Sequence, residues 1–349
     1  MSRQIALDNI HLKPTSRWAH TEYSLGYHTG YIQKMTGAPT LPDAAANREY
    51  NTACFIDFLF GVNDGLHGNW GARGRATDMG HAEYAENGTD LRQPKECPFA
   101  TAEDVWAFDP VTEYGLPDFD EQVKAYEQAY RNLTEQNPDQ LPTGGYYKTI
   151  VSGAIQSFGW EMLLVAAADP KKMEKVLDGF FRFTLHHMKA WAKTSAPVMI
   201  QHDDFVWTEG PFMHPEFYRN VIIPRFAELW KPLHAAGKKV LFCSDGTFTM
   251  FVDDLVKAGA DGFIFEPTND FGWMADRVGA THCLVGSYAD CRDMAFRSWD
   301  VVKETVDRTL AKAKQCKGLI LAVGNHIPAN VPDEMLGNYL KYVRTHWDR

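Results

Sequence analysis

From about residue 119 onward, short apolar segments alternate with longer segments that have helical periodicity. The apolar segments are continuous, as in "APVMIQ", "KKVLFC", "DGFIFE" and "GLILAV". Strands of this kind are typical of a parallel sheet that is covered on both faces, and the helices between them are the crossovers that such a sheet requires. The alternation therefore predicts an α/β fold, either a closed (β/α)8 barrel or an open doubly wound sheet.

Two further features of the sequence favour the barrel. The second half holds many strand–helix repeats, and the early apolar segment "ACFIDFLF" supplies another strand. Neither of the glycine-rich phosphate motifs of nucleotide-binding sheets is present, since no G-x-G-x-x-G follows a strand and G-x-x-x-x-G-K-[ST] does not occur. We therefore predict a (β/α)8 TIM barrel.

The chain of 349 residues is long enough for one such barrel, which needs about 250 residues or more. We expect one barrel domain over residues 1–349, with long loops at about 61–118, where Gly, Asn, Asp, His and Pro gather. In the periodic part, Asp118 or Asp120 is expected to cap a helix, and Pro224 to kink or break one.

The charge and the cysteines limit the classes of function. A formal net charge of −10 and a pI of about 5.7 argue against a nucleic-acid or anionic-membrane partner. The six cysteines are scattered without C-x-x-C spacing, which is typical of a reducing compartment. The N-terminus lacks the apolar core of a signal peptide, and no apolar run approaches the roughly 18 residues of a membrane span. We expect a cytoplasmic protein.

Polar side chains follow the apolar segments, and in a barrel all strand ends meet at one mouth, where active sites lie. The candidates after the strands are His202, Asp203, Asp204, Cys243, Asp245, Glu266, Ser287, Tyr288, Asn325 and His326, with Asn63, Asp64 and His67 after the early strand. Carboxylates close together raise one another's pKa, so such a site needs a cation, shared protons or a substrate with many donors.

A structural alternative exists for most of these residues. Asp245 precedes a glycine and could cap the next helix, and a lone buried Cys243 is more often a small core residue. His326 could make a structural hydrogen bond. Glu266 is harder to explain in this way, because an unpaired carboxylate that is buried after "FIF" is costly.

The order of four segments resembles the uroporphyrinogen decarboxylase superfamily, including its corrinoid-dependent methyltransferase branch. The segments are "HDDFVWTEGPFMHPEFYRNVIIPRF", "GKKVLFCSDGTFTMFVDDLVKAGADGFIFEP", "LVGSYAD" and "GLILAVGNHIPANVPDEML". The match covers nearly the whole chain, is strongest over 197–340, and implies the same (β/α)8 barrel. The arginine-rich "MRQAGRY" motif of true uroporphyrinogen decarboxylases is absent, so the resemblance favours the methyltransferase branch.

The resemblance also implies a metal. The methyltransferase branch holds zinc with a His-x-Cys pair after one strand and a further Cys after a later strand. Here the first pair corresponds to Cys243 and Asp245, and the later position falls near Asn325 and His326. With these ligand types we expect a divalent metal, zinc first, held by Cys243, Glu266 and His326, while harder oxygen ligands also suit other divalent metals.

The predicted function is that of a methyltransferase of the demethylase type. The methyl group of a small methylated compound, an O-methyl ether first, would pass to a corrinoid held by a separate partner protein, because no cobalamin-binding Asp-x-His-x-x-Gly segment is present. His202, Asp203 or Asp204 would manage the proton on the leaving oxygen. Family members often pair, which implies a homodimer. The substrate pocket is predicted to include Asn63, His67, Ser287, Tyr288 and Asn325.

Two other functions stay open at this point. One is a metal-free decarboxylase of a pyrrole or aromatic acid, in which Asp64 or Asp245 would stabilise a protonated intermediate. The other is a non-catalytic ligand-binding member of the fold, because a fold does not fix a function.

Overall fold

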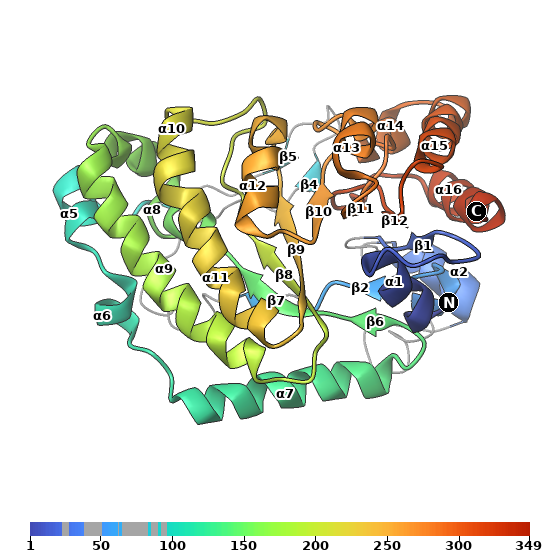
Figure 1. Ribbon diagram of the computed structural model, residues 1–349. Helices are drawn as coiled ribbons and strands as arrows, with labels where there is room; N and C mark the ends of the chain where they lie inside the picture. The colour runs from blue at the N-terminus through green and yellow to red at the C-terminus, as the bar shows by residue number, and fades with distance from the viewer. Residues whose placement is uncertain (23–27, 38–50, 62, 65–82, 85–89, 92–95) are drawn as a thin grey trace.

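Parallel strands form a ring in the computed structural model, which describes residues 1–22, 28–37, 51–61, 63–64, 83–84, 90–91 and 96–349 (Figure 1). The main sheet has eight strands in the order β1-β12-β11-β10-β9-β8-β7-β3, and each neighbouring pair is parallel. These strands are β1 (Ala19–His20), β3 (Asn63–Asp64), β7 (Gly144–Tyr147), β8 (Val198–His202), β9 (Lys239–Ser244), β10 (Gly262–Phe265), β11 (Cys283–Val285) and β12 (Gly318–Leu321).

Two short strands and two hydrogen bonds close the ring. β2 (Phe58–Leu59) precedes β3, β6 (Leu141–Pro142) precedes β7, and β2 pairs with β6 in parallel. The amide of Asp57 donates to the carbonyl of His20 at 2.8 Å, and the hydroxyl of Thr21 donates to the carbonyl of Phe58 at 2.6 Å, so β2 lies beside β1. The predicted (β/α)8 barrel and its early strand are therefore confirmed.

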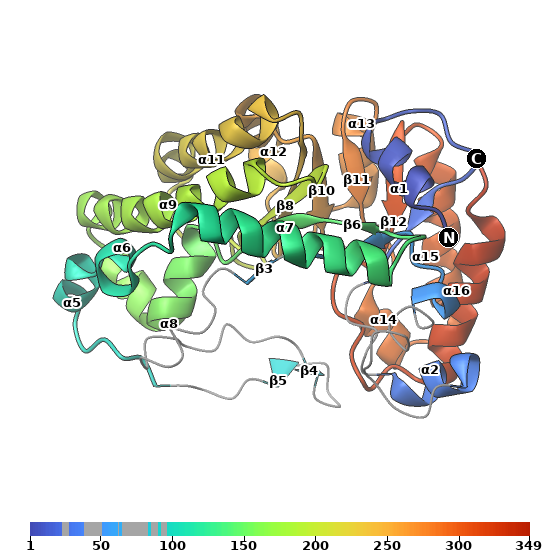
Figure 2. The same cartoon turned by 90° about the horizontal axis from the view of Figure 1, so that it is seen from below.

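Helices cover the outside of the ring (Figures 1 and 2). Helix α9 shows why, because its apolar spacing buries Met173, Val176 and Phe180 against the sheet side while its other face stays polar. The main outer helices are α7 (Phe119–Gln136), α8 (Val151–Ala167), α9 (Pro170–Ala192), α11 (Ile223–Ala235), α12 (Val252–Ala258), α13 (Phe271–Val278), α14 (Cys291–Phe296), α15 (Trp299–Ala313) and α16 (Asp333–His346). Among the described helices, none combines the length and apolarity that a membrane crossing needs.

The predicted helix signals are found where the sequence placed them. The side chain of Asp118 accepts a hydrogen bond from the amide of Glu121 and so caps α7. Near Pro224, a π-helix (Tyr218–Ile222) separates α10 (Pro215–Phe217) from α11, which begins beside the proline. Proline has no N–H and crowds the preceding turn, so the regular helix is interrupted there, as predicted.

The predicted long loops at about 61–118 are only partly described, by residues 61, 63–64, 83–84, 90–91 and 96–118, so this prediction stays a prediction. The described residues contain the end of the second barrel strand, an antiparallel pair and two short helices. These elements are β3, β4 (Glu83–Tyr84), β5 (Asp90–Leu91), α5 (Ala102–Ala107) and α6 (Pro110–Tyr114). Capping explains the two helices, because Thr101 forms a capping box with Asp104 and Asp109 caps α6. Two further helices, α1 (Arg3–Ile10) and α2 (Thr29–Thr36), lie near the start of the chain.

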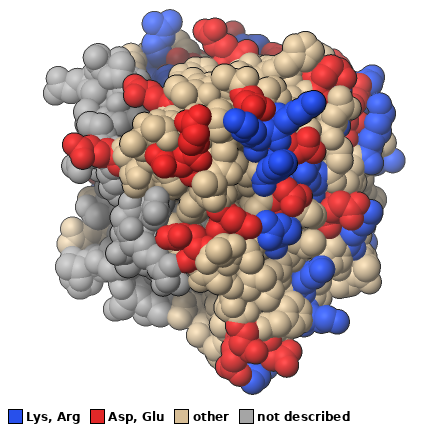
Figure 3. Space-filling view, turned by 90° about the vertical axis from the view of Figure 1, so that its left-hand side faces the viewer, with Lys and Arg blue, Asp and Glu red and all other residues tan. Residues whose placement is uncertain are grey.

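The outer surface over α5 and α9 mixes both signs of charge (Figure 3). Arg182 pairs with Asp109 at 2.6 Å, and Arg225 approaches Asp178 at 3.3 Å. Exposed pairs of this kind each stabilise a fold by about 0–1 kcal/mol, so they do little to position the site.

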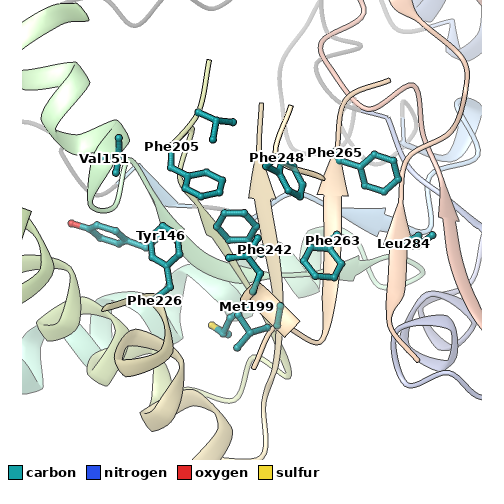
Figure 4. Packing of buried hydrophobic residues seen from close by; sticks show 14 of the residues in the cluster. Tyr146, Val151, Met199, Phe205, Phe226, Phe242, Phe248, Phe263, Phe265 and Leu284 are labelled. Atoms are coloured by element: carbon teal, nitrogen blue, oxygen red, sulfur yellow. The ribbon is translucent and has the colours of Figure 1, made fainter. Parts of the chain in front are cut away.

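Alternation along the strands sorts the side chains into two layers. Phe205, Phe242 and Phe263 pack between the sheet and the helices (Figure 4), whereas Ile200 and Leu241 belong to a separate buried cluster inside the ring. Successive side chains on a strand point to opposite faces. The same alternation turns the side chains at positions 202 and 243, which are directly paired between β8 and β9, toward the inside of the ring. The fold thus places an imidazole and a thiol at the carboxyl ends of two adjacent strands.

Candidate active site at the barrel mouth

A hollow of about 470 Å³, partly open to solvent, lies at the carboxyl ends of the strands. Its wall is apolar on one part and polar on the other. The lining residues are Phe60, Tyr147, His202, Cys243, Asp245, Ile264, Ala322, Gly324, Asn325 and His326. Among the described residues of this wall there is no lysine or arginine.

Three side chains in and beside the hollow are close enough to hold one metal ion. One ligand atom from each of His202, Asp204 and Asp245 lies within 4.8 Å of the others, and we name these three the metal-capable cluster. Nε2 of His202 lies 3.0 Å from Oδ1 of Asp204, and the same oxygen accepts a hydrogen bond from the amide of Asp245 at 2.9 Å. Imidazole and carboxylate are ordinary ligands of zinc and of harder divalent metals.

Strand β7 braces this cluster. The ring of Tyr147 stacks on that of His202 with centroids 4.0 Å apart, and its hydroxyl donates to Oδ2 of Asp204 at 3.4 Å. The imidazole is therefore held between an aromatic face and a carboxylate, which fixes its orientation. Tyr147 was not predicted as a site residue, although polar residues follow it in "YYKTIVSGA" as they follow the other strands.

The predicted metal ligands Cys243, Glu266 and His326 are close to this hollow but do not form a comparably compact set within the described residues. Cys243 and His326 line the hollow, whereas Glu266 is 8% exposed and bound to its neighbours. One oxygen of Glu266 accepts from the amide of Gly246 at 2.8 Å, and the other accepts from the side-chain amide of Asn325. Their role as a metal site stays a prediction.

The environment of these groups changes their acidity. Burial raises the pKa of the Cys243 thiol well above its ordinary value, and the charges of Asp245, Asp204 and Glu266 raise it further. Burial also raises the pKa of the Glu266 carboxyl, although the donors from Gly246 and Asn325 oppose the change. Without a cation, Cys243 is therefore a neutral thiol at neutral pH.

Asp203 is turned away from the hollow. Its side chain is fully buried and accepts hydrogen bonds from Thr149 Oγ1 at 2.6 Å, from the amides of Ile150, Val151 and Ser152, and from Ser152 Oγ. These donors form the start of α8, so this carboxylate caps the helix from the adjacent strand. Burial raises its pKa, and the donors oppose that change. The predicted catalytic role has no geometric support at this position.

The other predicted pocket residues divide into three groups. Asn325 lines the hollow, and its side-chain oxygen accepts from the amide of His326 at 2.6 Å. Ser287 is buried and donates to the carbonyl of Ala322 at 2.6 Å, while Tyr288 packs edge-on against Phe271, so neither lines the hollow.

The candidates after the early strand are only partly described. Asn63 and Asp64 form β3, whose backbone pairs with Tyr146 and Tyr147 of β7, and their side chains lie outside the described residues. His67 also lies outside them. The predicted roles of all three stay predictions.

A buried carboxylate after β1, Glu22, was not predicted from the sequence. Glu22 follows β1 and accepts from the Tyr339 hydroxyl at 2.5 Å and the Val323 amide at 3.0 Å, and it lies 3.0 Å from Nε2 of His20. We name these four groups the Glu22 network. The signal was available, because "AHTE" places a carboxylate after a strand in the same way as "MIQHDD".

The sequence of residues 88–346 matches the family described as uroporphyrinogen decarboxylase (URO-D). A structure of a methyltransferase from Methanosarcina mazei is similar over 98% of this chain and 97% of its own, with 17% identity and a TM-score of 0.67. A D-psicose 3-epimerase from Clostridium cellulolyticum H10 is similar over 71% and 91%, with 11% identity and a TM-score of 0.41, which is too weak a likeness to bear on function. No curated protein sequence matches this chain.

Proposed function

Because the chain belongs to the uroporphyrinogen decarboxylase family, we propose that it uses this barrel as a methyltransferase for a small methylated compound. The donor would be an O-methyl ether, and the acceptor would be a corrinoid held by a separate protein. The observation that supports this most is the metal-capable cluster in and beside a hollow at the carboxyl ends of the strands. The fold likeness to the Methanosarcina mazei methyltransferase is compatible with the proposal.

The composition of the wall argues against the porphyrinogen reaction for which the family is named. A substrate with several carboxylates requires cationic partners, of which Arg is the most suitable. The described lining offers none, and carboxylates stand nearby at Asp204, Asp245 and Glu266. Donors without negative charge suit such a wall, and Phe60, Ile264 and Ala322 supply an apolar surface for them.

The residues present fit a divalent metal. His202, Asp204 and Asp245 would hold it, and Cys243, which lines the same hollow, would serve as a further ligand once a cation offsets the charges that raise its pKa. When bound, the metal would supply Lewis-acid polarisation of the donor oxygen. This set shares Cys243 with the ligands expected from the sequence and replaces Glu266 and His326.

The proton and the reacting bond are then handled by the rest of the wall. In the proposed transfer the O–CH3 bond would break with oxygen keeping the electron pair, a reduced corrinoid on the partner would supply the pair for the new bond to carbon, and the oxygen would take a proton. Glu266 is suited to hold that proton, because burial raises its pKa and it lies beside the same strand ends. Asn325, which donates to Glu266, would orient that carboxyl.

Metal content tests the first half of the proposal. Purified wild type, Asp245→Asn and Cys243→Ala would be compared by elemental analysis after equilibration with zinc. We expect about one zinc per wild-type chain and much less in Asp245→Asn. Equal content in all three variants would remove the metal-capable cluster from the mechanism.

Methyl transfer needs a separate assay. Wild type would be incubated with reduced cobalamin and a panel of methyl ethers, and the absorbance change that marks methylcobalamin would be followed. Loss of this activity in Asp204→Asn, with the fold intact by circular dichroism, is the expected result. A metal-free preparation that instead decarboxylates a pyrrole or aromatic acid would support the rival function.

A further inference from the structure

A group of aromatic side chains on the loop that follows β8 and on α8 includes one exposed tryptophan and two half-buried rings. Trp207 is 46% exposed, its ring meets that of Trp160 at 4.6 Å, and Trp160 meets Phe212 at 5.2 Å. We name Trp160, Trp207 and Phe212 the aromatic ledge. Leu164, one turn after Trp160 on α8, is also exposed and extends the apolar surface.

Backbone contacts hold the ledge firmly beside the metal-capable cluster. Trp207 and Gly210 exchange two hydrogen bonds, at 2.7 and 3.0 Å, which close a tight hairpin. The amide of Thr247 donates to the carbonyl of Trp207 at 3.2 Å, and its hydroxyl donates to the carbonyl of Thr208 at 2.6 Å. Thr247 lies two residues after Asp245, so the hairpin is fastened to the same loop that supplies a cluster ligand.

Gly246 shows how close this attachment is. It has φ +76°, and a Cβ at this position would come 2.5 Å from the carbonyl oxygen of Trp207. Only glycine permits both the left-handed backbone and this approach. A rigid, exposed tryptophan is the kind of side chain that dominates binding energy at interfaces, because little conformational freedom is lost on contact.

Size identifies the occupant, on the premise of the proposed function. Even with its open mouth counted, the hollow encloses only about 470 Å³, so a corrin macrocycle attached to a protein cannot enter it. A corrinoid acceptor would therefore have to meet the methyl donor from outside the hollow. The flat face and methylated edge of a corrin ring suit stacking on aromatic rings, and the hairpin that carries Trp207 is hydrogen-bonded to the loop that follows Asp245.

We propose that the aromatic ledge is the platform on which the corrin ring of the methyl acceptor rests, with Trp207 as the principal contact. Trp160 meets the Trp207 ring edge to face, and Phe212 in turn packs against Trp160. The proposal rests on the proposed function for the identity of the ring, and on the ledge itself for its position.

Free hydroxocobalamin is the probe for the test, with binding measured by equilibrium dialysis and without any methyl donor. Wild type is expected to bind it, Trp207→Ala to bind at least about tenfold more weakly, and Trp207→Phe to recover part of the loss. Trp273, on α13 and 40% exposed, provides the matched control, because Trp273→Ala removes an equally accessible tryptophan away from the ledge. Unchanged circular dichroism would show that each variant is folded.

The outcomes separate this inference from the proposed function. Wild type that does not bind hydroxocobalamin, or Trp207→Ala that binds as wild type does, overturns the ledge assignment. Binding that depends on Trp207 without any methyl transfer would support the ledge assignment and contradict the proposed methyltransferase function. Methyl transfer with an unaltered KM for cobalamin in Trp207→Ala would support the proposed function and contradict the ledge assignment.

Discussion

Two sides of the barrel mouth carry carboxylates after strands, and they use them differently. On the β1–β12 side, Glu22 is buried and its oxygens accept from the Tyr339 hydroxyl and the Val323 amide. Each of these donors would be left unsatisfied in the protein interior without the carboxylate. The Glu22 network therefore ties the first strand to the last and to the closing helix.

On the β8–β9 side, two carboxylates lie close to each other. Asp204 and Asp245 bring like charges within 4.8 Å of one another, and Asp245 is partly exposed to solvent. Like charges at this distance cost stability, and their charges also raise the pKa of Cys243. The contrast teaches that a carboxylate after a strand is structural when backbone donors surround it, and a candidate for chemistry when other ligands do.

The largest effect is expected from a comparison of Asp203 with Asp204. These two carboxylates are adjacent in the sequence, but Asp203 has the structural kind of environment and Asp204 belongs to the metal-capable cluster. Asp203→Ala is expected to lower the free energy of unfolding by about 3 kcal/mol or more, because it leaves buried hydrogen-bond donors at the start of α8 without an acceptor. Asp204→Ala is expected to cost less than half as much. Urea unfolding measures both, and equal losses would show that the distinction between the two carboxylates is wrong.

Glu22→Gln probes the Glu22 network itself, with a smaller expected effect because the shape is kept. One carboxylate oxygen becomes an NH2 group, which cannot accept from Tyr339 or Val323, so a loss of about 2 kcal/mol in unfolding free energy is expected. Tyr339→Phe, which removes the hydroxyl donor, is the matched control and should cost less. A stability equal to that of wild type for Glu22→Gln would mean that the Glu22 network does not stabilise the contact between the first strand, the last strand and the closing helix.

Glu266 is expected to make the stability of the protein depend on pH, because burial raises the pKa of its carboxyl. The folded chain holds this proton at pH values where the unfolded chain has lost it, so stability falls as the pH rises above about 4.5 through the folded-state pKa. Glu266→Gln should therefore lose less stability than wild type as the pH rises above about 4.5, by about 1.4 kcal/mol for each pKa unit that separates the folded and unfolded states. Chemical denaturation across that range measures the slopes, and parallel slopes would contradict the assignment.

The architecture could be predicted from the sequence because it depends on repeated local signals. The continuous apolar segments became β8 to β12, and "ACFIDFLF" became β2, since burial on both faces leaves no other use for such runs. The mouth was predicted in outline for the same reason, and His202, Cys243 and Asp245 do meet there.

Which carboxylates at the mouth are structural and which form the metal-capable cluster could not be predicted, because this depends on which hydrogen-bond donors come from distant segments of the chain. Asp203 and Asp204 are identical side chains in sequence, and only the approach of the 149–152 backbone distinguishes them. Similarly, the grouping of Asp245 with Asp204 depends on the hydrogen bond between Asp204 Oδ1 and the Asp245 amide, which sequence spacing does not reveal. Tyr147 was missed because an aromatic residue at a strand end reads as core.

The smallest effect on stability is expected where the effect on chemistry is largest. Asp245→Asn keeps the backbone amide that donates to Asp204 and removes one of the clustered charges, so the free energy of unfolding should stay within about 0.5 kcal/mol of wild type in the absence of metal. Zinc affinity should nevertheless fall at least about tenfold, because a carboxylate ligand has been replaced by a neutral amide. Calorimetric titration of metal-free protein with zinc, beside Glu22→Gln as the control that should keep its zinc affinity, measures this. If Glu22→Gln loses zinc and Asp245→Asn keeps it, the two sides of the mouth have been assigned the wrong way round.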